Sequence, residues 1–393
     1  MPEYSILTPP PHRHRTLWIT LVVVVALVLV GGGAFLAGRK THGSAAGPAR
    51  ATTSTTGTTI ASTLRVVATT PAAGATDVPS DQAITVQLSA PVSAGSGMHT
   101  LSPPVAGTWK ADGTDTLTFQ AAAPLVPTTV ETLTVPAGPS GLTGTHGALL
   151  AAPTSVTFTV AQASTERLQQ MLAEVGYLPL SFTPSSPLAS PAAAFTAQPG
   201  SFAWKWPGLP AELTSLWTEG SENVITKGAV MNFQNQSGLT VDGVAGKQVW
   251  STLLADTAAQ KTDADPYVWV FVSKALPEAL TLFSNGVADP QLTNVAVNTG
   301  APGADTVDGT YPVFEHVPSS RMQGTNPDGS TYDDPAVPWA SYFNGGDALH
   351  GFVRASYGSP QSNGCVEMPV ATAAIVWPLT PIGTLVTVTG PSS

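Results

Sequence analysis

The chain has 393 residues, 10% of them charged, and a formal net charge of −10. This length allows two or three domains. A nucleic acid is not an expected partner, because neutralising phosphates requires clustered Lys and Arg, and the chain contains only 15 of these residues. The 37 glycines and 36 prolines favour short strands, turns and linkers over long helices, so we expect a mainly β protein.

Residues 17–38 form an uncharged apolar segment near the N-terminus. A helix of this length, rising ~1.5 Å per residue, is long enough for a hydrocarbon core of ~30 Å. We therefore expect a transmembrane signal anchor in the cytoplasmic membrane, preceded by a cytoplasmic tail over residues 1–16. A cleaved signal peptide is the alternative, which we disfavour because no clear small-residue cleavage site precedes Arg39. Residues 39–63 are mostly Ala, Thr, Ser and Gly and predict a flexible linker.

Residues 64–162 show apolar and polar residues in strict alternation. Ile84, Val86 and Leu88 are separated by polar residues, and the same pattern recurs at Leu117 and Phe119, at Leu133 and Val135, and at Val156, Phe158 and Val160. This period predicts half-buried antiparallel strands and therefore a β-sandwich. The segment 70–79, Thr-Pro-Ala-Ala-Gly-Ala-Thr-Asp-Val-Pro, resembles the opening of bacterial Ig-like domains. We expect an Ig-like domain with a structural role.

Residues 163–260 predict a small module of three helices. The first has apolar residues at helical spacing and is expected to be capped by Thr165 and to end at Gly176. Its apolar residues are Leu168, Met171, Leu172 and Val175, and the later helices contribute Val230 and Phe233, then Val249, Trp250, Leu253 and Leu254. Together with the glycine turn at 237–246, these parts resemble the peptidoglycan-binding-domain family.

An insertion over residues 180–222 interrupts this module. It contains four aromatic residues that need a partner surface: Phe202, Trp204, Trp206 and Trp217. Their expected role is to pack the insertion against a neighbouring domain. A glycan-stacking or domain-docking surface is the alternative.

Residues 264–390 return to β-strand patterns and predict an all-β domain. The expected strands lie at 267–272, 279–283, 295–297, 310–314 and 385–388, with Asn285-Gly286 as a hairpin turn. The only cysteine of the chain, Cys365, lies in this domain, 15 positions after His350. It is either a buried apolar residue or a reactive thiol, and the polar residues 361–364 before it predict an accessible loop, which favours the thiol.

A nucleophilic thiol needs a neighbouring base, which a His on an adjacent strand can supply. His350-Gly351 and Ser362-x-Gly364-Cys365-Val366 match the motifs of the L,D-transpeptidase (YkuD-type) catalytic family, which they resemble. Further similarity lies at residues 298–303, 308–313, 339–346 and 381–386. Two positions depart from the family: Asn363 replaces the usual His, and Glu367 replaces the usual Asn or Arg. Arg354 is the nearest candidate partner for Glu367.

The resemblance implies an enzyme that cross-links peptidoglycan stem peptides, without metal or other cofactor, through a thioester on Cys365. His350 is implied as the base, with its tautomer held by the Gly351 carbonyl. The backbone N–H groups of Gly364 and Cys365 are implied as donors to the oxyanion. We expect the substrate to contact Trp339, Tyr342, Phe343, Ser362 and Asn363, with a role in the protein core as the alternative for the three aromatic residues.

The resemblance further implies inhibition by carbapenem-type β-lactams, with acylation at Cys365. It places the catalytic domain on the extracytoplasmic side of the membrane, facing the cell wall. Two alternatives remain. If water rather than an amine accepts the acyl group, the protein is an L,D-carboxypeptidase. If the catalytic domain has lost its activity, the protein is a non-catalytic cell-wall binding protein.

Overall fold

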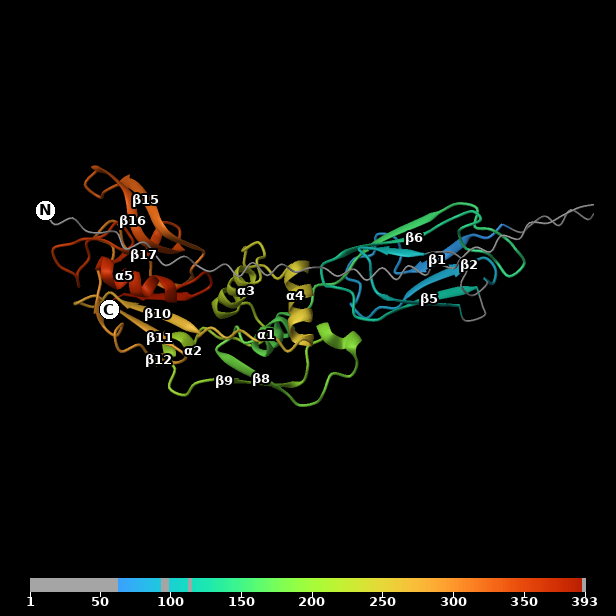
Figure 1. Ribbon diagram of the computed structural model, residues 1–393, viewed down its shortest axis with the longest axis horizontal. Coiled ribbons are helices and arrows are strands. Elements are labelled where there is room, and N and C mark those ends of the chain that lie inside the picture. The colour runs from blue at the N-terminus through green and yellow to red at the C-terminus, as the bar shows by residue number, and fades with distance from the viewer. Residues whose placement is uncertain (1–62, 93–98, 112–114, 391–393) are drawn as a thin grey trace, which may run out of the picture. The chain divides into compact units, whose positions relative to one another are not determined.

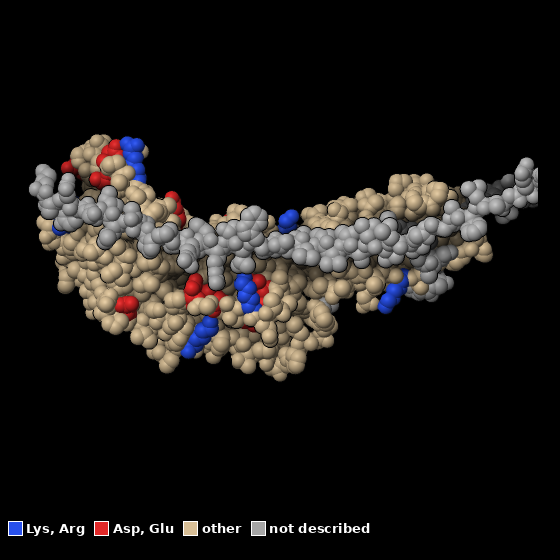
Figure 2. Space-filling view, viewed as in Figure 1, with Lys and Arg blue, Asp and Glu red and all other residues tan. Residues whose placement is uncertain are grey.

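The computed structural model describes residues 63–92, 99–111 and 115–390 (Figure 1). The predicted tail, the predicted membrane anchor at 17–38 and nearly all of the predicted linker lie outside these residues. Within the described ranges, no helix has both the length and the apolar character that crossing a membrane requires. On the face in Figure 2, the charged side chains that are visible lie scattered among uncharged ones.

The first domain is a sandwich of two antiparallel sheets. One sheet has the order β1 (Val66–Thr70), β2 (Ile84–Leu88), β5 (Thr116–Ala121) and β4 (Gly107–Ala111). The other has the order β3 (Thr100–Ser102), β6 (Val130–Val135) and β7 (Thr154–Thr159).

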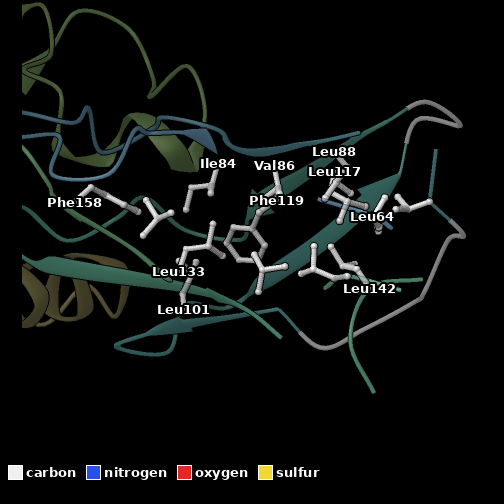
Figure 3. Packing of buried hydrophobic residues seen from close by; sticks show 14 of the residues in the cluster. Leu64, Ile84, Val86, Leu88, Leu101, Leu117, Phe119, Leu133, Leu142 and Phe158 are labelled. Carbon is white, nitrogen blue, oxygen red and sulfur yellow. The ribbon is translucent and has the colours of Figure 1, made fainter. Parts of the chain in front are cut away.

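Alternating apolar residues of the two sheets form the core of this sandwich. Figure 3 shows Val86 and Phe119 of one sheet pointing toward Leu133 of the other. Pairs such as Val86 and Leu117 are directly opposite each other across β2 and β5. Because one face of each strand is buried, the alternation predicted from the sequence is confirmed for all four runs.

The helical module contains α1 (Thr165–Glu174), α3 (Val224–Gln236) and α4 (Lys247–Ala258). The first helix ends as predicted, since Gly176 has a φ of 94° just after the C-cap residue Val175. The predicted N-cap is wrong by one residue. Ser164 is the cap, and its Oγ accepts the backbone N–H of Arg167 at 3.1 Å, so Thr165 is the first residue of the helix.

The insertion folds into a hairpin of β8 (Leu180–Pro184) and β9 (Gly200–Trp204), with two short helices, η1 (Pro191–Phe195) and α2 (Ala211–Thr214). The ring of Phe202 packs against Trp217, with centroids 5.3 Å apart. Trp206 stacks on Tyr267, which directly precedes strand β10 of the C-terminal domain, with the ring centroids 6.3 Å apart. These contacts support the packing interpretation of the inserted aromatic residues.

The C-terminal domain contains two sheets. The first has the order β12 (Val287–Ala288), β11 (Ala279–Ser284), β10 (Val268–Ser273), β19 (Leu385–Thr389) and β14 (Gly309–Pro312), with β13 (Val295–Ala296) also paired to β11. The second has the order β15 (Glu315–Thr325), β16 (Thr331–Asn344), β17 (Asp347–Gly351) and β18 (Val366–Met368). Asn285 and Gly286 both have positive φ, 49° and 78°, as the predicted hairpin turn requires.

The expectation of an all-β domain needs one correction. The run Val370–Val376 forms a helix, α5, followed by a 3-10 turn, η2 (Trp377–Leu379). Its Ala373 and Val376 are buried in the same core as Val270, Leu349 and Val366 of the two sheets. Packing of these apolar residues against the sheets therefore outweighs the weak helix propensity of the two valines, Val370 and Val376, and of Ile375.

The helical module and the first sheet of the C-terminal domain share a core. Trp269 of β10 and Leu385 of β19 belong to the same buried cluster as Phe233 and Trp250 of the module. The backbones come close at Gly228, where a methyl group would lie 2.7 Å from the carbonyl oxygen of Gly383. Small residues at this contact allow the helix to approach the sheet edge.

Candidate active site

A cleft of about 690 Å³ opens beside the second sheet of the C-terminal domain. Its walls come from the long hairpin β15–β16, from β17 and from the segment that leads into β18. Both Cys365 and His350 line this cleft. The pair singled out in the sequence is therefore brought to one cavity.

The parallel pairing of β17 with β18 places the two reactive residues on neighbouring segments. His350 is opposite Glu367 and Leu349 is opposite Val366, so Cys365 directly precedes the paired part of β18. The expectation that the His lies on a strand adjacent to the Cys is thereby confirmed. Parallel strands need a crossover connection, and residues 352–365 provide it.

The imidazole of His350 is buried, with 2% of its surface exposed. Its Nδ1 lies 3.1 Å from the carbonyl oxygen of Gly351, as the family resemblance implies. A carbonyl can only accept, so Nδ1 carries the proton and Nε2 has a free lone pair. Burial lowers the pKa of His350, and the hydrogen bond to Gly351 partly offsets this effect. The residue is therefore a neutral imidazole near pH 7, the form that can take a proton.

Cys365 is partly exposed as a whole residue, while its thiol is contacted from β17 and the turn before it. Its Sγ donates to the Gly346 carbonyl at 3.5 Å and accepts the backbone N–H of Ala348. Burial, with smaller contributions from the nearby carboxylates of Asp347 and Glu367, raises the pKa of Cys365 to about 12, against the opposing effect of the Ala348 hydrogen bond. The resting group is thus a thiol, which must lose its proton to a base during attack.

The loop before Cys365 is held by Ser362. Ser362 is buried; its Oγ donates to the Cys365 carbonyl at 2.6 Å and accepts the Gly364 N–H at 3.2 Å. The Ser362 hydroxyl therefore fixes the loop, and its contact with substrate stays a prediction. The Gly364 N–H is also not free for an oxyanion, because Ser362 already accepts it.

Asn363 lines the cleft at the position where the family usually has His. Its Nδ2 donates to Oδ1 of Asn326 at 2.7 Å, in the turn that joins β15 and β16. Asn363 therefore connects the loop before Cys365, the nucleophile loop, to the tip of the long β15–β16 hairpin. Because an imidazole is absent at this position, His350 is the histidine that lines the described cleft.

Arg354 and Glu367 form the ion pair anticipated from the sequence. Arg354 Nε and Nη2 donate to the two carboxylate oxygens of Glu367, both at 2.7 Å. Arg354 also donates to the Gln361 carbonyl at 3.3 Å and lies over the Phe352 ring at 4.7 Å. The guanidinium thus offsets the charge that the buried Glu367 brings close to the thiol.

The three aromatic residues proposed as substrate contacts, Trp339, Tyr342 and Phe343, do not all lie in the cleft. Tyr342 lines the cleft, and its hydroxyl is 2.7 Å from Ser320 Oγ. Phe343 is 2% exposed and belongs to the core between the sheets, while Trp339 packs against Trp377 at 5.3 Å. Neighbouring residues of a strand point to opposite faces, so Tyr342 and Phe343 cannot both reach the cleft. The structure therefore supports the alternative of a core role for Phe343, and it places Trp339 against that core rather than in the cleft lining.

The sequence did not single out several residues of the cleft. Asn326, Tyr332 and Asp334 come from the β15–β16 hairpin, and Asp347 begins β17. A turn signal, Asn-Pro-Asp-Gly at 326–329, marks the hairpin tip in the sequence, but nothing local shows that this hairpin borders the thiol. Among the residues that the structure describes, no group of three or more His, Cys, Asp or Glu is arranged to hold a metal ion.

Three family models match the chain. Residues 61–160 match a bacterial Ig-like domain, residues 220–253 a putative peptidoglycan binding domain, and residues 267–388 the L,D-transpeptidase catalytic domain. The second match covers α3 and part of α4, while α1 lies outside it. No curated protein matches the chain.

Similar solved structures include an L,D-transpeptidase from Mycobacterium smegmatis, at 12% identity over 83% of this chain and 99% of that one, with a TM-score of 0.29. Another is L,D-transpeptidase 3 from Mycobacterium tuberculosis with a faropenem-derived adduct, at 13% identity over 83% and 98%, with a TM-score of 0.29. The catalytic domain of the E. faecium L,D-transpeptidase is 21% identical over 31% and 96%, with a TM-score of 0.28.

The family models confirm the three family resemblances that the sequence indicated, over residues 61–160, 220–253 and 267–388. The chain carries a bacterial Ig-like domain, a segment similar to peptidoglycan-binding domains and, over residues 267–388, an L,D-transpeptidase catalytic domain.

Proposed function

We propose that this protein forms peptidoglycan cross-links between stem peptides through a thioester on Cys365, as part of cell-wall biogenesis. One observation carries the proposal: a neutral His350 with a fixed tautomer lines the same cleft as the only thiol, within the matched catalytic domain. A thiol with a raised pKa reacts when a base removes its proton during attack, which is the role that His350 is placed to fill.

In the first step, Cys365 attacks the carbonyl carbon between the L-centre of diaminopimelate and the terminal D-Ala of a tetrapeptide stem. His350 Nε2 takes the thiol proton as the C–S bond forms. The C–N bond then breaks, and His350 returns the proton to the nitrogen, so that D-Ala leaves as a neutral amine. The Gly351 carbonyl stabilises the imidazolium that exists between these two transfers.

The oxyanion of the tetrahedral intermediate needs donors fixed near the sulfur. We assign this role to the backbone N–H of Cys365. The Gly364 N–H is bonded to Ser362, whose second hydrogen bond to the Cys365 carbonyl holds the peptide in place. Ser362 therefore supports the oxyanion site indirectly.

We further propose that residues 17–38 anchor the chain in the cell membrane with the catalytic domain on the cell-wall side. The linker, the Ig-like domain and the helical module then separate the cleft from the bilayer, and peptidoglycan is the substrate within reach. The match of residues 220–253 to a peptidoglycan binding domain supports this location. We expect carbapenem-type inhibitors to acylate the same thiol.

The test is the intact mass of the purified full chain, in detergent, after incubation with a carbapenem. We expect a single covalent adduct that is absent in Cys365→Ala and forms at least tenfold more slowly in His350→Ala, as general-base catalysis contributes about 10²–10⁴-fold. Circular dichroism confirms that each variant is folded. A folded wild-type protein without adduct would overturn the proposal and favour the non-catalytic binding protein.

The same preparation distinguishes the two enzymatic alternatives. Incubation with a tetrapeptide stem yields a cross-linked dimer if an amine accepts the acyl group, and a tripeptide if water does. Mass spectrometry separates these products. A tripeptide as the sole product would identify an L,D-carboxypeptidase.

A further inference from the structure

A carboxylate that the sequence did not single out lies beside the reactive thiol. Asp347 is located between the two residues that contact Cys365 Sγ, namely Gly346 through its carbonyl and Ala348 through its N–H. It also borders the nucleophile loop, since a methyl group on Gly364 would lie only 2.5 Å from Asp347 Oδ1. Asp347 lines the same cleft as the thiol and His350.

The carboxylate of Asp347 is held by neutral donors. Asn344 Nδ2 donates to Oδ2 at 3.2 Å, and the Val307 backbone N–H also bonds to the carboxylate. In the part of the chain that the structure describes, no Lys, Arg or His lies within 4.0 Å of it. This distinguishes Asp347 from Glu367, whose charge is matched by Arg354.

An unpaired carboxylate at this position opposes the first chemical step. Its charge disfavours the thiolate of Cys365, which must develop as the thiol loses its proton. The same charge favours any cation that comes to the reacting carbon. After acylation the sulfur is a neutral thioester, so the penalty disappears while the attraction for a cation remains.

The acceptor of a cross-linking reaction is such a cation, because the side-chain amine of diaminopimelate is protonated near neutral pH. We propose that Asp347 binds the ammonium of the acceptor stem and thereby selects an amine over water at the acyl-enzyme. This inference rests on the proposed function, and it names the residue that decides between transpeptidase and carboxypeptidase outcomes.

The proton balance of the second step is consistent with this role. The ammonium transfers one proton to the Asp347 carboxylate, and the neutral amine attacks the thioester carbonyl carbon. A C–N bond forms and the C–S bond breaks. His350 takes the remaining proton from the attacking nitrogen and passes it to the sulfur, which restores the thiol, and Asp347 releases its proton to water. Burial raises the pKa of Asp347, which makes it a better acceptor for the ammonium proton.

The experiment measures two quantities on the full chain: the rate of acylation by a carbapenem, and the ratio of dimer to tripeptide formed from a tetrapeptide stem. Asp347→Asn keeps the size of the side chain and removes the charge, and Asp347→Ala is the second variant. Asp308→Asn is the matched control, because this carboxylate pairs with Lys274 at 2.7 Å and does not line the cleft.

We expect Asp347→Asn to acylate at least as fast as wild type while its dimer-to-tripeptide ratio falls about tenfold, as expected for the loss of a partly buried ion pair. The control should change neither quantity. A loss of folding cannot produce this pair of opposite effects. An unchanged ratio in both Asp347 variants, or equal slowing of both steps, would overturn the assignment. A wild-type protein that forms no acyl-enzyme would instead refute the proposed function itself.

Discussion

Removing Arg354 should reveal how strongly the site depends on its buried ion pair. Glu367 is 4% exposed and has both carboxylate oxygens on the guanidinium, so Arg354→Ala leaves a buried charge without its partner. Breaking such a pair costs about 3–5 kcal/mol when both groups are buried. The Arg354 side chain is 31% exposed, so we expect a loss of about 2–3 kcal/mol in the free energy of unfolding.

The same change should slow the chemistry. The charge of Glu367 raises the pKa of both His350 and Cys365, and the charge of Arg354 lowers that of His350. Without Arg354, the imidazole holds its proton to higher pH and the thiol ionises less readily. In the pH profile of the acylation rate, the rise on the acid side should therefore shift to higher pH, and the rate near neutral pH should fall.

Urea unfolding and carbapenem acylation between pH 5 and 9 measure these two effects. The double variant Arg354→Ala/Glu367→Gln removes the stranded charge and should recover most of both losses. Arg321→Ala is the matched control for the unfolding measurement, because Arg321, which also lines the cleft, has the same two-bond geometry to Asp333, at 2.8 and 2.6 Å, on the exposed hairpin, where solvent screens the pair. If Arg354→Ala behaves like this control, or if the double variant is no better than the single one, the reasoning fails.

Two other substitutions test separate parts of the structure. Glu131 is buried in the Ig-like domain, and burial raises its pKa from 4.5 to about 7, so folding favours the protonated acid and stability is lost as the pH rises through this interval. Glu131→Gln should therefore raise the stability by on the order of 2 kcal/mol at pH 8 and change it little at pH 4, and thermal unfolding at both values checks this. Gly364→Ala should slow acylation at least tenfold with the fold retained, because φ is 109° and the added methyl collides with Asp347; wild-type acylation in this folded variant would contradict that explanation.

Local patterns in the sequence predicted the sandwich and singled out His350 and Cys365, which line one cleft, for physical reasons that differ. The alternation around Val86 and Leu133 works because each sheet of the sandwich has one buried face. His350 and Cys365 were found because a thiol needs a base, and the glycines beside them match a known motif. Asp347 was missed because its role depends on backbone atoms of residues 346 and 348 that contact the thiol only in the fold.

The site candidates to which the structure gives other contacts have a common physical explanation. Trp339 and Phe343 were placed in the cleft from their proximity to His350 in sequence, whereas strand alternation directs Phe343 into the core. The Gly364 N–H was assigned to the oxyanion without knowing that Ser362 Oγ lies 3.2 Å away. In each case the residue type was compatible with the predicted role. A contact that forms only in the folded chain gives the residue a different role.

The charges around the thiol indicate that reactivity depends on bound substrate. Burial, Asp347 and Glu367 all oppose the thiolate, and the Ala348 N–H alone favours it. A small alkylating reagent meets this protonated thiol without assistance, whereas a ligand positioned in the cleft allows His350 to take the proton as the new bond forms. We therefore expect small alkylating reagents to modify the resting protein slowly, and the carboxylate that contributes to this effect is the one that we assign to the acceptor amine.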